Sequence, residues 1–428
     1  MRRLFFLFVY NLFFPLFLLL ALPSYLIKMK RRGGVGTGLL ERFGVYHRSE
    51  EEEPRGGIYV HAVSVGEVML ALKFIREWRK CHPEEGVALA TSTSTGHEVA
   101  RHAGLPHLRV LYAPLDLPFL SGRCLRRFQP KCVVLVEAEL WPNFSRYARR
   151  VSLPVVMINA RLSPRSERRY ARFPRLSRLL FSGLSGMGVQ SRRDVGRFAR
   201  IGVDTQIIRL TGSIKFDVIQ GEKMAVRSDF RAILAPLSAG RPIVLAASTH
   251  KGEELIIAEA ARRAGAFPLI VPRHAERRDE VVRELTAAGF RCILRSRGEE
   301  PESVGDDVCY IVDTTGELRE WTALASVAVI GKSFLAVGGQ NPVEAIAAGV
   351  PVIVGPDMSN FEDLISLLLK HEGIVQCSTA DLAENIRYLF DHEDEAAEMA
   401  GRAFNALRIH SGATERSVSL VESCLKSA

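Results

Sequence analysis

The chain has 428 residues, of which 47% are hydrophobic and 25% are charged, and its formal net charge at pH 7 is +9. This length suggests two or three domains, and the composition is that of a globular protein rather than a disordered one. The excess of basic residues favours anionic partners, such as nucleic acid, acidic lipid or phosphorylated substrates.

An apolar segment opens the chain. Residues 4–27 are almost wholly apolar, with Asn11 as the most polar interruption. As a helix they would measure roughly 36 Å, which exceeds the ~30 Å hydrocarbon core of a bilayer. The larger basic cluster follows the apolar run, so the positive-inside rule places the rest of the chain in the cytoplasm. We therefore predict a membrane anchor over residues 1–33, with a cleaved signal peptide or a shallow interfacial helix as the alternatives.

The first loop after a predicted strand holds a carboxylate. Residues 57–60 have the pattern of a short buried strand, and residues 68–75 have helical periodicity. The loop His61–Glu67 is therefore expected at the carboxyl edge of a parallel sheet, where ligands bind. Glu67 begins the helix and can take a proton from a substrate hydroxyl if its pKa is tuned toward neutrality. The structural alternative is that Ser64 caps the helix and Glu67 completes a capping box.

The rest of the first half continues this alternation. Further strands are predicted over residues 87–91, 110–114, 132–136 and 154–159. The fourth strand of this half runs into Glu137, Glu139 and Trp141, for which a plain solvated turn is the alternative. Strands that alternate with helices predict a parallel, doubly wound sheet.

Cationic residues cluster later in the first half. Seven arginines between Arg161 and Arg178 are interleaved with apolar side chains. This predicts either a basic amphipathic surface for anionic headgroups or phosphates, or a solvated helix face. Lys215, in a later loop, is a candidate partner for an anionic group. Nothing in the chain has the pattern of a nucleic-acid-binding module.

The second half repeats the α/β pattern after a polar linker over residues 220–229. Its strands are predicted over residues 242–247, 267–271, 308–312, 327–331 and 350–355, and each ends in polar or glycine residues. This predicts one ligand at a common sheet edge. Late in the chain, Asn341 is a candidate N-cap, with Pro342 at the first helical position and Glu344 in the first turn. We predict domains over residues 34–219 and 220–428, with the last helix a candidate to pack back on the first domain.

Absent motifs limit the cofactors. There is no GxGxxG, GxxxxGK[ST] or DxD motif, and no histidine pair has metal-ligand spacing. The seven cysteines are scattered and form no CxxC pair, which argues against zinc and disulfides and for a reducing compartment. Neither a dinucleotide nor a metal site is predicted.

Eight motifs in order resemble the Kdo transferase family of GT-B glycosyltransferases: HAVSVGE, VEAELWPN, NARLS, TGSIKFD, STHKGEE, PRH, DTTGEL and GGQNPVEA. That family moves 3-deoxy-D-manno-oct-2-ulosonic acid (Kdo) from CMP-Kdo to a lipid A precursor, lipid IVA, in lipopolysaccharide biosynthesis. The resemblance implies two Rossmann-like domains facing a central cleft, no cofactor, no nucleic-acid partner, and catalytic domains on the cytoplasmic side of a bacterial inner membrane. Gln340 and Ala345 depart from the pattern, where histidine and proline are more usual, and this puts acceptor details in doubt.

The resemblance also implies residue roles. It makes Glu67 the general base and Glu137 and Lys215 transition-state stabilisers. It implies contacts to CMP from Pro272, Arg273, Gly316, Glu317, Leu318, Asn341, Pro342, Val343 and Glu344. Attack opposite the leaving group would invert the anomeric carbon. An arginine near the donor's carboxylate is also expected, although the sequence does not say which one.

Two other functions remain compatible with the sequence. One is a GT-B enzyme that uses a UDP-sugar, either as a transferase or as an epimerase. The other is a non-catalytic sensor of nucleotide sugars or lipid A, against which the joint presence of Glu67, Glu137 and Lys215 argues, because a sensor needs no base.

Overall fold

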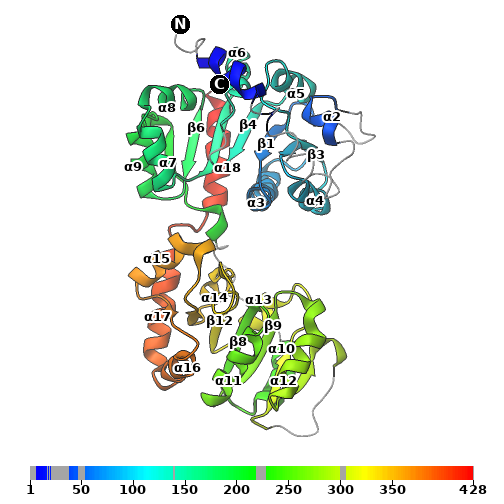
Figure 1. Ribbon diagram of the computed structural model, residues 1–428, viewed down its shortest axis with the longest axis vertical. Coiled ribbons are helices and arrows are strands. Elements are labelled where there is room, and N and C mark those ends of the chain that lie inside the picture. The colour runs from blue at the N-terminus through cyan, green and yellow to red at the C-terminus, as the bar shows by residue number, and fades with distance from the viewer. Residues whose placement is uncertain are drawn as a thin grey trace. The chain divides into compact units, whose positions relative to one another are not determined.

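The computed structural model describes residues 6–16, 18, 20, 38–46, 54–137, 140–217, 228–298 and 305–427. The chain forms two compact units (Figure 1): unit 1 comprises Met1–Asp217 and Gly412–Ala428, and unit 2 comprises Val218–Ser411. The chain therefore leaves unit 1 after Asp217 and re-enters it at Gly412. The predicted linker falls largely outside the described residues, and the first helix of unit 2 begins at Ser228.

Unit 1 is built on a seven-stranded parallel sheet with the strand order β3-β2-β1-β4-β5-β6-β7. The inner strands β1, β2, β4, β5 and β6 are short runs buried on both faces, as expected of a parallel sheet covered by helices, while the edge strands β3 and β7 are partly exposed. Their bounds are β1 Ile58–Ala62, β2 Val87–Thr91, β3 Leu108–Tyr112, β4 Cys132–Val136, β5 Val155–Ala160, β6 Gly186–Val189 and β7 Ile208–Leu210.

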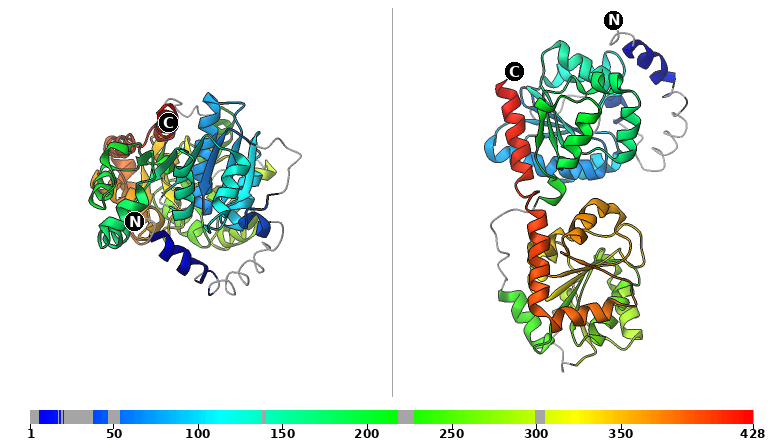
Figure 2. Two further views of the ribbon diagram at one scale, coloured as in Figure 1. Left: turned by 90° about the horizontal axis from the view of Figure 1, so that it is seen from above. Right: turned by 90° about the vertical axis from the view of Figure 1, so that its left-hand side faces the viewer.

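Helices cover both faces of this sheet. They are α2 Gly38–Arg42, α3 Val65–Cys81, α4 Ser94–His102, α5 Leu120–Phe128, α6 Pro142–Arg150, α7 Pro164–Ala171, α8 Pro174–Phe181 and α9 Arg192–Arg200, with 3₁₀ turns η1 Thr205–Ile207 and η2 Ile214–Phe216. The last helix of the chain, α18 (Ala413–Lys426), also belongs to unit 1 and packs against α3 and β6 (Figure 2).

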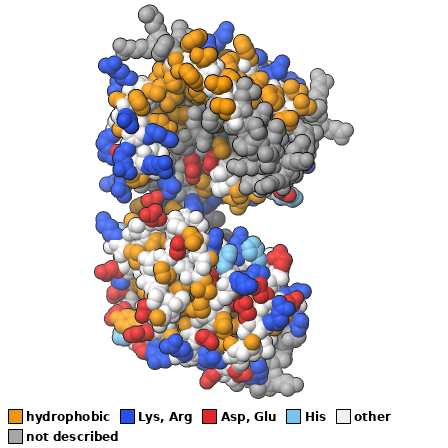
Figure 3. Space-filling view, in the orientation of Figure 1, with side chains coloured by type: hydrophobic (Ala, Val, Ile, Leu, Met, Phe, Trp, Pro, Cys, Tyr) orange, Lys and Arg blue, Asp and Glu red, His pale blue; other side chains and the backbone are white. Residues whose placement is uncertain are grey.

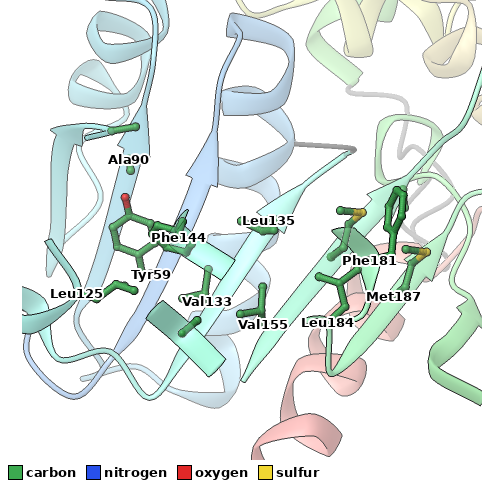
Figure 4. Packing of buried hydrophobic residues seen from close by; sticks show 14 of the residues in the cluster. Tyr59, Ala90, Leu125, Val133, Leu135, Phe144, Val155, Phe181, Leu184 and Met187 are labelled. Atoms are coloured by element: carbon green, nitrogen blue, oxygen red, sulfur yellow. The ribbon is translucent and has the colours of Figure 1, made fainter. Parts of the chain in front are cut away.

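Two apolar clusters form the core of unit 1, one on each face of the sheet. Because successive strand residues point to opposite faces, Tyr59, Leu135 and Met157 join one cluster, while Val60 and its neighbours on the other face join the second. Figure 4 shows the first cluster, in which Phe144 of α6 packs over Tyr59 with ring centroids 5.6 Å apart.

Near the N-terminus, residues 6–16 are helical and contact α6 of the same unit. The side-chain amide of Asn143 in α6 donates to Oδ1 of Asn11 at 2.7 Å. In the parts of the chain that the structure describes, no helix combines the length and the apolar character needed to cross a bilayer. Most of the predicted anchor, residues 1–33, lies outside the described residues.

Unit 2 repeats the architecture with a second seven-stranded parallel sheet, ordered β10-β11-β9-β8-β12-β13-β14. Its strands are β8 Ile243–Thr249, β9 Phe267–Pro272, β10 Arg291–Leu294, β11 Val308–Ile311, β12 Val327–Ile330, β13 Val352–Val354 and β14 Val375–Gln376. Its helices are α10 Ser228–Ser238, α11 Glu253–Arg263, α12 Arg278–Ala287, α13 Leu318–Thr322, α14 Val343–Ala347, α15 Glu362–Lys370, α16 Leu382–Asp391 and α17 Glu393–Leu407, with 3₁₀ turns η3 Ala275–Arg277, η4 Arg295–Arg297 and η5 Ser359–Phe361.

The predicted fold of two parallel-sheet α/β domains is confirmed. The strands that were not predicted are short or carry few apolar residues: β6, β7, β10 and β14. The arginine-rich stretch from Arg161 to Arg178 forms two helices, α7 and α8, because Pro174 starts a new helix after Phe173.

Each sheet has a switch point, where two neighbouring strands are followed by connections that run in opposite directions across the sheet. In unit 1 this switch point lies between β1 and β4, and in unit 2 it lies between β8 and β12. Ligands of open α/β sheets bind at such points, beyond the carboxyl ends of the strands. The loops after these four strands are therefore the candidate ligand-binding loops.

Candidate active site

The loop after β1 presents Glu67 at the switch point of unit 1. Ser64 caps α3 and accepts the Glu67 N–H at 3.3 Å, while the Ser64 hydroxyl donates to Oε1 of Glu67 at 2.9 Å. The Val63 N–H donates to the other carboxylate oxygen, Oε2, at 2.8 Å. A capping arrangement is thus present, and it also fixes the orientation of a half-buried carboxylate at the sheet edge.

The loop after β4 presents Glu137 at the same switch point. Glu137 has φ of +63°, and Asn159 at the end of neighbouring β5 has φ of +54°. Non-glycine residues rarely adopt this left-handed conformation, and backbone strain of this kind is concentrated at functional sites. The Glu137 N–H donates to the Ile158 carbonyl at 2.9 Å, so the strained residue is held against β5.

Electrostatic interactions join the predicted catalytic residues. Burial raises the pKa of Glu137, and the charge of Glu67 raises it further, whereas Arg161 and Lys215 lower it. Burial also lowers the pKa of Lys215; Arg161 adds to this effect and Glu137 opposes it. The structure therefore brings Glu67, Glu137 and Lys215 together at one sheet edge.

Arg161 is a member of this group that the sequence could not single out. It lies just beyond β5, in the NARLS motif, and is one of seven arginines in its stretch. Its neighbour Leu162 is held by α9, because the Arg197 guanidinium donates to the Leu162 carbonyl at 2.7 Å. Only the fold distinguishes Arg161 from the arginines of α7 and α8.

His61, at the start of the His61–Glu67 segment, is not a surface group. It is 5% exposed at the end of β1, and its ring meets that of Trp141 edge-on, with centroids 6.2 Å apart. Burial lowers the pKa of His61 to about 4, which makes it neutral at pH 7. Its role is therefore to pack beneath the site rather than to carry charge.

In unit 2, the predicted CMP-binding residues lie at the carboxyl edge of the sheet, in loops or in the strand and helix ends that adjoin them. Pro272 ends β9, and the Arg273 N–H donates to the Thr249 carbonyl at 3.0 Å, which joins the ends of β9 and β8. Gly316 has φ of +88°, and no atom lies within 4 Å of the position that a Cβ would take. The Gly316 backbone is thus open to a ligand.

Glu317 and Leu318 start α13, and Glu317 is held by several donors. Its carboxylate accepts from Arg295 Nε at 3.2 Å, from the Thr314 hydroxyl at 2.5 Å and from the Trp321 indole at 3.3 Å. Burial works to raise the pKa of Glu317, but these hydrogen bonds outweigh it and lower the pKa. The side chain therefore shapes the loop.

The Asn341–Glu344 segment differs slightly from the prediction. Helix α14 begins at Val343, so Pro342 is the cap residue rather than the first helical residue. The Asn341 side chain still accepts the Val343 N–H, at 3.2 Å. Burial raises the pKa of Glu344, a change that Arg319 opposes and Glu320 favours.

Glu253 is a structural residue of unit 2 that the sequence did not reveal. It is fully buried at the start of α11, after β8, and accepts the His250 N–H at 2.9 Å. It also accepts three N–H groups of the loop after β12: Lys332 at 2.5 Å, Phe334 at 3.0 Å and Leu335 at 3.4 Å. One carboxylate thus ties together the two loops of the switch point.

Gln340, which departs from the expected pattern, contacts His250. Nε2 of the Gln340 amide lies 3.1 Å from Nε2 of His250, and the His250 and His274 rings meet edge-on. Burial lowers the pKa of His250. The contact of Gln340 with His250 joins the segment after β12 to the loop after β8. Within the described ranges, no group of three or more His, Cys, Asp or Glu side chains is arranged to hold a metal ion.

Comparison of the sequence with known proteins gives a consistent result. The family model for 3-deoxy-D-manno-octulosonic-acid transferase (kdotransferase) matches residues 37–218. The chain is 33% identical, over 91% of both chains, to a 3-deoxy-D-manno-octulosonic acid transferase of Haemophilus influenzae. It is 34% identical to a Bordetella pertussis protein of the same name, over 86% of this chain and 87% of that one.

Among solved structures, the fold is similar to that of a UDP-GlcNAc 2-epimerase from Neisseria meningitidis. The TM-score is 0.56 at 14% sequence identity, over 86% of this chain and all of that chain. A glycosyltransferase from Rickettsia africae gives a TM-score of 0.54 at 10% identity, over 87% of this chain and all of that one. At these identities the likeness concerns the fold alone.

Proposed function

The chain belongs to the 3-deoxy-D-manno-octulosonic acid transferase family and is a glycosyltransferase, and we propose that it transfers Kdo from CMP-Kdo to a lipid A precursor with inversion at the anomeric carbon. The observation that carries this proposal is the group of Glu67, Glu137, Arg161 and Lys215 at the switch point of unit 1. A carboxylate, Glu137, whose pKa responds to a second carboxylate and to two cations suits a reaction that separates charge.

Glu67 is the group that takes the proton of the attacking hydroxyl. Its carboxylate is oriented by Ser64 and by the Val63 N–H, which limits its freedom to rotate. Because the base is oriented before the substrate binds, orienting it adds nothing to the activation free energy. Attack on the face opposite CMP then inverts the anomeric carbon.

The remaining charges of the group match those of the transition state. Breaking the sugar–phosphate bond builds positive charge at the anomeric carbon, which the carboxylate of Glu137 stabilises. The departing CMP gains negative charge, which Lys215 and Arg273 offset. We assign Arg161 to the carboxylate of the sugar, because a guanidinium can bind a carboxylate through two parallel hydrogen bonds.

Unit 2 supplies the donor site in this proposal. The open backbone at Gly316 and the exposed Arg273 are available to CMP. Glu317 and Glu253 hold the surrounding loops, so that Leu318 and the Asn341–Glu344 segment keep their places. These cationic and backbone groups can bind a phosphate without a metal ion.

The acceptor is proposed to be lipid-linked and to reach the site from the cytoplasmic leaflet of a bacterial inner membrane. Figure 3 displays Lys and Arg side chains gathered over the part of unit 1 that carries α7 and α8. The residues concerned are exposed: Arg165, Arg168, Arg169, Arg172, Arg175 and Arg178, together with the apolar Phe173. Arginines beside an exposed aromatic ring suit an anionic lipid surface.

An apolar groove lies near the same surface. It is lined by Phe6, Leu7, Leu140, Pro142, Ser145, Arg149, Leu179 and Leu180. The helix over residues 6–16 forms one wall, and its Phe8, Leu12 and Phe13 are exposed. A groove that combines apolar walls with one arginine is compatible with an amphiphilic acceptor that carries phosphate.

The test is incubation of the purified protein with CMP-Kdo, generated in situ, and a tetraacylated lipid A precursor, followed by mass spectrometry of the lipid. A mass gain of one or more Kdo units is expected. If the lipid mass does not change while CMP-Kdo persists, the donor and acceptor are wrongly assigned, and a screen of UDP-sugars becomes the next experiment.

A further inference from the structure

The turn that carries Lys215 has few hydrogen bonds of its own. η2 spans Ile214–Phe216, and within it the Phe216 N–H donates to the Ser213 carbonyl at 3.1 Å. A single 3₁₀ turn is a weak structure, because its hydrogen-bond geometry is poor and it lacks the support of further turns. The position of the Lys215 side chain therefore depends on groups outside the turn.

Two side chains from distant parts of unit 1 bind the backbone of this turn. Oδ1 of Asn159, at the end of β5, accepts the Ile214 N–H at 2.9 Å. The ammonium group of Lys73 donates to the Ile214 carbonyl at 3.1 Å and to the Asp217 carbonyl at 2.6 Å. Lys73 belongs to α3, whose first turn contains Glu67. The turn is thus attached to the helix of the proposed base.

Asp217, which follows η2, is attached to the returning chain. Its carboxylate accepts the Gly412 N–H at 2.7 Å and the Thr414 N–H at 2.8 Å, and also bonds to the Thr414 hydroxyl. These N–H groups lie at the start of α18 and have no partner within the helix. Because the chain leaves unit 1 after Asp217 and re-enters it at Gly412, one carboxylate joins both crossing points.

We propose that Lys73 and Asp217 are positioning residues that hold the ammonium group of Lys215 beside Glu137 during the reaction. This inference rests on the proposed function, since it concerns the lysine assigned to that reaction. Neither residue acts on the substrate. Lys73 acts through two backbone carbonyls, and Asp217 fixes the end of the same turn to α18.

Burial supports the role of Lys73. Its side chain is half-buried, and burial lowers the pKa of Lys73, while Asp217 and Glu77 oppose that change. A partly desolvated ammonium group that lost its carbonyl partners would be left without hydrogen bonds, which costs free energy, and the same holds for the carbonyl groups. Loss of this group would release η2 from α3 while leaving Lys215 itself intact.

The first test compares Lys73→Met with wild type. Methionine keeps most of the apolar stem and removes the ammonium group. We expect kcat to fall by roughly tenfold to a hundredfold, the scale of a displacement of about 1 Å at a catalytic group. The KM for CMP-Kdo should stay within about twofold, because the donor site is not altered. Lys73→Arg, which keeps the charge and the donors, should recover part of the loss.

Two matched variants control for general effects. Lys80→Met removes an exposed lysine of the same helix, which pairs with Glu77 at 2.8 Å. Asp204→Asn alters another aspartate that caps a 3₁₀ turn of unit 1, where its Oδ1 accepts the Gln206 N–H at 2.9 Å. Both should retain wild-type kcat. Asp217→Asn, which replaces one acceptor oxygen with an amide nitrogen that can only donate, should lower kcat as Lys73→Met does.

A double-mutant cycle distinguishes positioning from a general structural role. In a Lys215→Met background, Lys73→Met should change kcat by less than about twofold, because the group that it positions is already absent. An equal loss in both backgrounds would overturn the inference. If Lys73→Met does not fold, as judged by circular dichroism, the same cycle is run with Asp217→Asn.

The outcome is separable from failure of the proposed function. If wild-type protein transfers no Kdo, the proposed function itself is wrong. If wild type is active and both Lys73→Met and Asp217→Asn match the two control variants, only the positioning inference fails.

Discussion

Glu67 and Glu253 occupy corresponding places in the two units, and their surroundings differ. Each follows one of the two strands at its switch point and lies in the first turn of the next helix. Glu67 is half-buried and accepts hydrogen bonds from its own loop. Glu253 is fully buried and accepts N–H groups from the loop after β12 as well.

This difference distinguishes a catalytic carboxylate in unit 1 from a structural carboxylate in unit 2. In unit 2, the carboxylate of Glu253 accepts hydrogen bonds from backbone N–H groups at the switch point, so it holds two loops together. In unit 1, the second loop brings Glu137, with its positive φ and its raised pKa. A carboxylate whose pKa stays raised despite nearby cations costs stability, as is typical of groups at functional sites.

The largest effect is expected from Glu67→Gln. Glutamine can still accept in the capping arrangement, so the free energy of unfolding should change by less than about 1 kcal/mol. Loss of the base should lower kcat on the order of 10³-fold. Steady-state transfer assays and urea unfolding of the same preparation check both values. Wild-type activity in this variant would remove Glu67 from the mechanism.

Glu253→Ala should show the opposite pattern. It leaves buried N–H groups of both switch-point loops without their acceptor, and this should cost about 3 kcal/mol of the free energy of unfolding. Denaturant unfolding followed by tryptophan fluorescence measures the loss, with Glu259→Ala on the outer part of α11 as the control. Unchanged unfolding would mean that the loops do not depend on Glu253.

Lys215→Met should lower kcat by about 10²-fold, because it removes a cation that faces developing negative charge. Its folding should be little affected, since the Lys215 side chain is exposed. Pre-steady-state measurement of the transfer step checks this expectation. A rise in KM alone, at unchanged kcat, would show that Lys215 binds the substrate without stabilising the transition state.

Arg161→Met should raise the KM for CMP-Kdo by roughly tenfold, the value of one charge-assisted hydrogen bond. Arg165→Met, in the exposed first turn of α7, is the matched control. Kinetic titration of the donor checks both variants. If the two behave alike, Arg161 contributes only to the general basic surface.

The smallest effect concerns stability and pH in Glu137→Gln. The pKa of Glu137 is raised in the folded state, so folding favours its neutral form, and that stabilisation is lost as pH rises through the folded pKa. Glutamine resembles the neutral form and should stabilise the protein at pH 7 by about 1 kcal/mol. The difference in stability between Glu137→Gln and wild type should vanish below pH 4.5, the ordinary pKa of a glutamate. Urea unfolding at several pH values tests this; a gain that persists in acid would contradict it.

The sequence was informative where a strand end is visible locally. Glu67 and Glu137 follow compact apolar strands, so their meeting at one edge could be predicted. The position of Lys215 could not, because η2 is held by Lys73, which lies 141 residues away from Ile214 in the sequence. Local sequence could not separate Glu253 from Glu67 either, because the bonds that distinguish them come from Lys332 and its neighbours, 79 residues and more away.

The most direct test of the account measures CMP affinity and Kdo transfer on the same Glu67→Gln preparation, with Arg273→Ala alongside. The account predicts that Glu67→Gln binds CMP within about twofold of wild type by calorimetry but transfers no Kdo above about a thousandth of the wild-type rate. Arg273→Ala should lose CMP affinity. The account assigns catalysis to the sheet edge of unit 1 and donor binding to the sheet edge of unit 2. It is contradicted if Glu67→Gln loses CMP affinity as Arg273→Ala does, or if Glu67→Gln still transfers Kdo at the wild-type rate.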